Sequence, residues 1–194
     1  MVRGLTAWKV SRSIPKEIRR EWTRHAHQIG EISTSWNLLQ DAFFELFWIV
    51  VANHETEKHS MVHALWHTIQ SDKTQREMLE NISKNHPTLS KRWRANIKWA
   101  TKKAYDLSKV RNDSIHTPVQ FAYLPNARPI LRLQKVSAKK QAVDRLTVNP
   151  TATVWRAVRG DLVALANYCH AMSSSYVAHG PTGPLPRKPP LQSL

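Results

Sequence analysis

The chain has 194 residues, which is enough for one domain with a hydrophobic core but short for two such domains. Its 29 Lys and Arg residues outnumber 14 Asp and Glu residues, and the formal net charge of +15 favours polyanions as partners. A hydrophobic content of 41% excludes a wholly disordered chain, and the single cysteine excludes an intrachain disulfide or a cysteine-rich zinc site. The longest apolar run, residues 46–52, is too short to cross a membrane, so we expect a soluble, cytoplasmic protein.

Three segments of the chain differ in composition. Residues 1–13 are basic, and we expect them to form a flexible N-terminus. Residues 14–177 carry apolar side chains at helical spacing and form the predicted helical bundle domain. Residues 178–194 are rich in proline, which predicts a disordered or polyproline tail.

The first predicted helix begins at Pro15, because proline suits the first turn of a helix and Ser13 can cap it. Gly30 is a predicted break or close-packing point. A second helix is predicted over residues 31–53, where the apolar stripe widens until nearly every side is apolar. A helix of that kind is expected in the middle of a bundle or against a second subunit.

Three further helical segments follow. Residues 54–67 are predicted to be helical at least in part, and Asp72 is predicted to cap a helix that reaches about residue 85. A long helix is predicted over residues 89–116. Pro118 ends it, because proline disfavours helical geometry in the residue before it.

The pattern then changes before the last helix. Residues 117–149 contain short apolar or β-branched runs separated by Pro, Asn and Lys, which predict one or two short strands or an irregular excursion. Residues 151–177 return to helical spacing. The sequence therefore predicts an all-α fold, a bundle of four to five helices with a short irregular or β-like insert before the last helix.

The predicted helix over 89–116 is strongly basic. Between residues 91 and 111 it carries eight basic side chains and one acidic side chain, Asp106. A solvated helix face normally mixes charges of both signs, so this excess favours a track for phosphate groups, with a merely solvated face as the alternative. The candidate nucleic-acid-binding residues are Lys91, Arg94, Lys98, Lys102 and Lys109.

Arg111 continues the apolar stripe of this helix. The stripe consists of Trp93, Ile97, Ala100, Ala104 and Leu107. Because burying an unpaired charge is costly, Arg111 must face a cleft, a partner carboxylate or an anionic ligand. Asn112 and His116 share one face near the helix end, and His116 lies about 140° around the helix from Arg111, a gap that the arginine side chain can close. The helix dipole favours the protonated form of a histidine in the last turn.

The run from Val110 to His116 resembles the signature of the HEPN superfamily, an arginine, a polar residue and then a histidine at the end of a bundle helix. The resemblance implies an α-bundle over about 14–177 that acts as a metal-independent endoribonuclease without a cofactor. It implies that His116 acts on the 2′-hydroxyl proton or the leaving oxygen, that Arg111 holds the scissile phosphate, and that Asn112 positions one of them. The expected products carry a 2′,3′-cyclic phosphate and a 5′-hydroxyl.

The same resemblance implies partners. Active members pack two subunits so that their motifs face one cleft, so a homodimer acting on RNA is expected, in a toxin or defence setting and with an antitoxin or regulatory protein as a further partner. The alternative is a bundle without catalysis that binds RNA or a protein. In that case Arg111 and Asn112 bridge helices through Asp41 or Glu45.

A row of histidines offers a second kind of site. Glu55, His59, His63 and His67 recur every four residues and would share one face of a continuous helix. Histidines four residues apart can chelate zinc or nickel, so His59, His63 and His67 are the candidate metal ligands. We expect exposed or stacking histidines instead of a metal centre, and one of them lining the RNA cleft is a further possibility.

Eight tryptophans are many for a chain of this length. Trp22, Trp36, Trp93 and Trp155 fall on inward stripes, which predicts that they belong to the core. Cys169 lies on an apolar stripe of the last helix and is expected to be a buried, unreactive thiol.

Overall fold

The computed structural model describes residues 15–116, 119–122, 130–133 and 151–192, and the structural statements below refer to these residues. They confirm the predicted all-α bundle. The elements in chain order are α2 (Lys16–Ala52), the 3₁₀ turn η1 (Thr56–Lys58), α3 (His59–Thr68), α4 (Asp72–Asn85), α5 (Lys91–His116), β1 (Val119–Ala122), β2 (Ile130–Leu133) and α7 (Thr151–His179). The strands β1 and β2 pair antiparallel, with Val119 opposite Leu133. Within the described residues, no helix is long and apolar enough to span a membrane.

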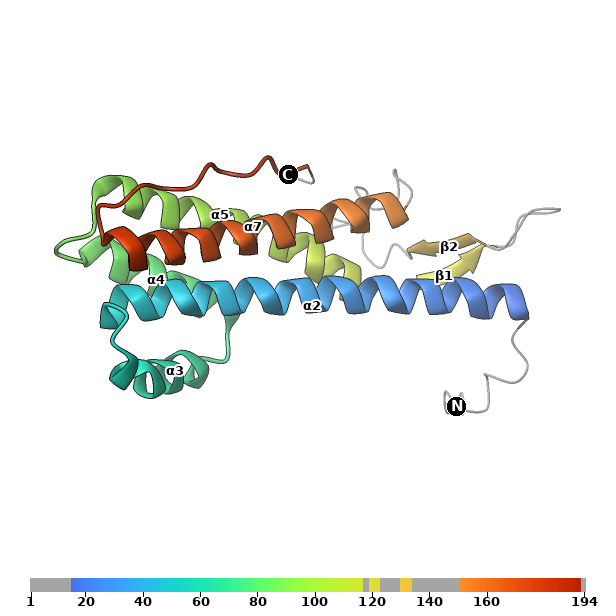
Figure 1. Ribbon diagram of the computed structural model, residues 1–194. Coiled ribbons are helices and arrows are strands. Elements are labelled where there is room, and N and C mark those ends of the chain that lie inside the picture. Colours follow the sequence, from blue (N-terminus) through green and yellow to red (C-terminus); the bar gives the residue numbers. More distant parts are fainter. Residues whose placement is uncertain (1–14, 117–118, 123–129, 134–150, 193–194) are drawn as a thin grey trace.

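The longest helix, α2, runs the length of the bundle and organises the others around it (Figure 1). The helix α7 packs along α2, and α5 packs against both α4 and α7. The short helix α3 lies on the opposite side of α2 from α5 and α7 (Figure 1). As a result α2 is covered on two sides, which explains why its apolar residues spread over most of its circumference.

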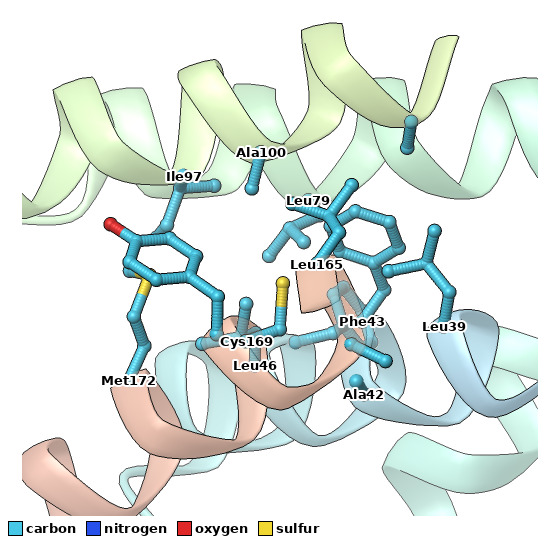
Figure 2. Close-up of a cluster of buried hydrophobic side chains, with 14 of the residues drawn as sticks. Leu39, Ala42, Phe43, Leu46, Leu79, Ile97, Ala100, Leu165, Cys169 and Met172 are labelled. Carbon is cyan, nitrogen blue, oxygen red and sulfur yellow. The ribbon is translucent and has the colours of Figure 1, made fainter. Parts of the chain in front are cut away.

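Side chains from α2, α4, α5 and α7 form the central part of the core, which also includes Val62 and Trp66 of α3. Figure 2 shows Leu39, Ala42, Phe43 and Leu46 of α2 meeting Leu79 of α4, Ile97 and Ala100 of α5, and Leu165, Cys169 and Met172 of α7. All of them are fully buried. Burial of each large apolar side chain contributes roughly 1.5–3 kcal/mol, so this shared core holds the four helices together. The thiol of Cys169 is part of it, and burial raises its pKa far above the ordinary value, as expected for an unreactive cysteine.

Local signals mark where the helices begin and end. The Oγ of Ser71 accepts a hydrogen bond from the backbone N–H of Thr74 at 3.4 Å at the start of α4. The Oγ of Ser90 likewise accepts from the backbone N–H of Trp93 at 3.3 Å at the start of α5. The helix α2 ends at Asn53, which adopts a left-handed conformation with φ of 49°.

The predicted break at Gly30 is wrong, because α2 continues through it as one helix. A glycine inside a helix costs about 1 kcal/mol relative to alanine, which the burial of a single neighbour such as Ile32 outweighs. Gly30 is not a close-packing point either. It is exposed, and a Cβ added there would meet nothing within 4 Å.

Three of the four predicted core tryptophans are buried, and the fourth is not. Trp36, Trp93 and Trp155 are at most 2% exposed, whereas Trp22 is 49% exposed. Trp22 lies near the N-terminal end of α2, where its ring centroid is 5.8 Å from that of His25. Helical spacing alone therefore did not predict how far its ring is covered.

The described residues of the proline-rich segment contact the helices. α7 extends to His179, and residues 180–192 then run back along α5 and α7 (Figure 1). The indole N–H of Trp93 donates to the carbonyl of Gly183 at 3.0 Å, and the backbone N–H of Gln192 donates to Asp161 Oδ1 at 2.9 Å. An extended proline-rich chain has no internal hydrogen bonds, so these contacts with the helices supply its order.

Candidate functional site

Arg111 lies at the C-terminal end of the buried stripe of α5. The five apolar residues of that stripe, Trp93, Ile97, Ala100, Ala104 and Leu107, are fully buried, as predicted. Arg111 follows Leu107 one turn later and is half-buried. The helical repeat therefore brings a guanidinium to the edge of the core, where charge is costly without a partner.

Arg111 lies over an indole ring. Its Cζ is 5.5 Å from the centroid of the Trp36 ring of α2, and its Nη1 donates to Asn112 Oδ1 at 2.9 Å. Its Nε is buried and has no hydrogen-bond partner in the described part of the chain. No carboxylate of the described residues pairs with it. Of the three surroundings expected for this arginine, the partner carboxylate is therefore not found.

A second arginine lies over the same ring. Arg76 of α4 is 5% exposed, and its Cζ is 5.3 Å from the Trp36 centroid. Burial lowers the pKa of Arg76, while the charges of Asp72 and Glu77 act in the opposite direction. Trp36 Nε1 donates to Asp72 Oδ2 at 2.8 Å, so this indole links α2 to α4 and carries a guanidinium from each of α4 and α5.

Gln40 lies one turn after Trp36 on α2, and both polar atoms of its amide are buried without a hydrogen-bond partner among the described residues. The same is true of Arg76 Nη1. Buried polar groups are almost always hydrogen-bonded in proteins, so the unpartnered atoms of Gln40, Arg76 and Arg111 need an explanation. We call Trp36, Gln40, Arg76 and Arg111 the Trp36 cluster.

Sequence reasoning identified Arg111 and missed the other polar members of the cluster. A signal for each was present. Arg76 lies three residues before the buried Leu79 on α4, and Gln40 lies four residues after Trp36, so helical spacing places both on buried stripes.

The other two motif residues are placed by the same helix. Asn112 is exposed and accepts the hydrogen bond from Arg111. His116 is the last residue of α5, so the predicted five-residue helical spacing from Arg111 holds in the backbone. The side chain of His116 lies outside the part of the chain that the structure describes.

The candidate phosphate track divides into two groups. Three of its lysines, Lys91, Lys98 and Lys102, are exposed along α5. Arg94 is half-buried, and its Nη2 donates to the carbonyl of His86 at 2.6 Å, which ties α5 to the end of α4. Lys109 lies 3.4 Å from Asp106 and over the ring of Tyr105. The lysines offer charge to solvent, whereas Arg94 holds two helices together.

The histidine row packs on one aromatic side chain. The ring centroids of His59, His63 and His67 lie 5.5, 5.2 and 6.0 Å from that of Phe44 on α2. His63 and His67 are themselves 4.1 Å apart. In the described residues no group of three or more His, Cys, Asp and Glu side chains is arranged to hold a metal ion. The row makes edge-on and tilted aromatic contacts between α3 and α2.

Glu45 does not bridge to Arg111. Its Oε2 lies 2.8 Å from His170 Nδ1, so it joins α2 to α7. Asp41 is exposed on α2. The bridge through these carboxylates that the non-catalytic reading requires is not found in the described residues, and Arg111 contacts Trp36 and Asn112 instead.

Comparisons of the chain with protein-family models, with curated proteins and with solved structures found no match. The functional proposal therefore depends on the residues and contacts of this chain.

Proposed function

We propose that this protein is a metal-independent endoribonuclease of HEPN type. The observation that supports the proposal most directly is the state of Arg111. Its guanidinium lies on an indole at the edge of the core, with one buried N–H unpartnered and no carboxylate paired to it among the described residues. A phosphodiester supplies both the charge and the acceptors that this guanidinium lacks.

The proposed reaction is an internal transfer within RNA. The 2′-oxygen attacks the adjacent phosphorus, the bond from phosphorus to the 5′-oxygen breaks, and a 2′,3′-cyclic phosphate and a 5′-hydroxyl result. His116 takes the proton of the 2′-hydroxyl or protonates the departing 5′-oxygen. Arg111 binds the scissile phosphate and offsets the negative charge that grows on its oxygens. Asn112 orients Arg111 through the 2.9 Å hydrogen bond between their side chains.

The rest of the helix serves binding. The exposed lysines of α5 attract the RNA backbone towards the C-terminal end of the helix, where the motif lies. The proposal includes a homodimer in which two motifs face one cleft. It also includes a cytoplasmic site of action, a toxin or defence role, and control by an antitoxin or regulatory protein.

A bundle that binds RNA or a protein without cleaving RNA is the second candidate. One observation favours a protein partner. Met61 and Leu65 of the short helix α3 are 57% and 51% exposed, which is high for apolar side chains of this size.

Cleavage of RNA in excess chelator separates the two candidates. The wild-type protein is expected to cleave, and Arg111→Ala and His116→Ala are each expected to slow cleavage by about 100-fold or more. Arg20→Ala, which removes an exposed arginine of α2, is the control and should keep the wild-type rate. Equal cleavage by every variant would contradict the proposal, as would RNA that is bound but left intact by the wild type.

A further inference from the structure

The structure contains a second buried cation that the proposed mechanism does not use. Arg76 comes from α4, and its guanidinium lies over Trp36 as that of Arg111 does, at 5.3 and 5.5 Å from the ring centroid. Arg76 is the more buried of the two, and its Nη1 has no hydrogen-bond partner among the described residues. Both guanidiniums are attracted to the same ring, so the indole brings together an arginine from α4 and one from α5.

The carboxylates near the indole act on Arg76. Asp72 is one of them, and one of its oxygens already accepts the N–H of Trp36. It acts on Arg76 together with Glu77, and no carboxylate of the described chain pairs with Arg111. Arg111 therefore has no carboxylate partner among the described residues, and an anion would supply one.

The unpartnered atoms match the needs of a phosphate group. Arg111 Nε and Arg76 Nη1 are hydrogen-bond donors, and Gln40 adds an amide from α2 whose polar atoms are also unpartnered. These groups come from three helices. Arg111 and Gln40 are half-buried, so part of each side chain reaches solvent, although the unpartnered atoms themselves are covered.

We propose that Arg76, Gln40 and Arg111 form one phosphate-binding site for the RNA backbone, in which Arg76 is a second phosphate-binding residue supplied by α4. The inference rests on the proposed function for the identity of the ligand, since α5 carries both Arg111 and the exposed lysines assigned to RNA binding. Two guanidiniums together bind a phosphodiester more firmly than Arg111 alone. The indole of Trp36 holds both of them in position.

The test measures binding separately from cleavage. The probe is a single-stranded 2′-O-methyl RNA, which lacks the attacking hydroxyl and stays intact with every variant. Arg76→Met keeps the approximate volume of the buried side chain and removes its charge. The matched control is Lys73→Met, which removes the same charge from an exposed position on the same helix.

Arg76→Met is expected to weaken binding of this RNA about 10-fold at fixed salt. It is also expected to lower the slope of log affinity against log salt by about 0.7, the value for one lost phosphate contact on a single strand. Lys73→Met should leave both close to the wild type. Unchanged affinity and slope in a folded Arg76→Met protein would overturn the proposal.

Two further variants decide the question if Arg76→Met does not fold. Arg76→Lys keeps the buried charge but cannot reproduce the planar donor geometry, and Gln40→Leu removes the amide from a half-buried position. Each is expected to weaken binding several-fold, and wild-type affinity in both would overturn the proposal.

If the wild type cleaves natural RNA while these variants bind normally, the site is wrong and the nuclease proposal stands. If it does not cleave and the variants lose affinity, the site stands and the nuclease proposal is wrong.

Discussion

Arg111 and Arg94 lie on the same helix, but replacement by methionine is expected to change the free energy of unfolding by different amounts. Arg94 joins two elements, because its Nη2 donates to the carbonyl of His86 beyond the end of α4. A hydrogen bond from a charged group contributes about 1.5–3 kcal/mol. Arg94→Met should therefore lower the free energy of unfolding, by less than that full amount because the buried Nε of Arg94 has no hydrogen-bond partner among the described residues.

Arg111→Met should change the free energy of unfolding by less than about 1 kcal/mol. Its hydrogen bond goes to the exposed side chain of the next residue, Asn112, and so joins no two elements. Its contact with Trp36 is worth about 0.5–2 kcal/mol, and its unpartnered Nε costs about 1–3 kcal/mol, so the two nearly cancel. Methionine keeps much of the apolar contact with the ring.

Urea unfolding followed by circular dichroism at 222 nm measures both variants at the same pH and salt. This signal reports helix content and is not altered by the change next to an indole. A loss of stability in Arg111→Met as large as that in Arg94→Met would refute the reasoning. Arg111 would then be a structural residue of the bundle, and its assignment to a ligand would lose its physical basis.

Three further predictions concern the segment after α7, the pH dependence and the basic face. Trp93→Phe removes the indole N–H that donates to the carbonyl of Gly183 and is expected to lower the free energy of unfolding by about 1–2 kcal/mol, measured by urea unfolding; an unchanged value would mean that this contact does not hold the segment. Burial lowers the pKa of His25 from 6.5, so the unfolded chain binds more protons just below that pH, and the free energy of unfolding should fall as the pH drops below about 6.5, by at most about 1.4 kcal/mol per pH unit. In melts at pH 5 to 8, His25→Gln should lose this part of the pH dependence, and a pH profile identical to that of the wild type would contradict the prediction. Lys98→Gln and Lys102→Gln should each lower the salt slope of RNA binding by about 0.7, and slopes that match the wild type would remove these lysines from the interface.

The long helix α5 could be predicted from the sequence because its signals are local. A regular stripe from Trp93 to Leu107 sets its inner face, and Pro118 lies two residues after its last residue, His116. The position of Arg111 on that stripe was enough to predict that it meets the edge of the core. Which residue it meets depends on the packing of α2 against α5, and helical spacing alone does not contain that information.

The rest of the candidate site depends on tertiary contacts. Arg76 has the spacing of a buried residue, but a charged side chain on a short polar helix is normally exposed, so its burial follows only from the presence of Trp36 opposite it. The segment 180–192 is a similar case. Its composition is typical of a disordered chain. Its order is explained by hydrogen bonds and aromatic contacts with the helices, which the composition of the segment does not predict.

Identification of the ends left on cleaved RNA tests the central claim most directly. The purified protein is incubated with a synthetic RNA in excess chelator, and the fragments are resolved by mass spectrometry. The account predicts fragments that end in a 2′,3′-cyclic phosphate and begin with a 5′-hydroxyl, and no cut at a position where the RNA carries a single 2′-deoxy substitution. Fragments with 3′-hydroxyl and 5′-phosphate ends, or cleavage at the deoxy position, would contradict it.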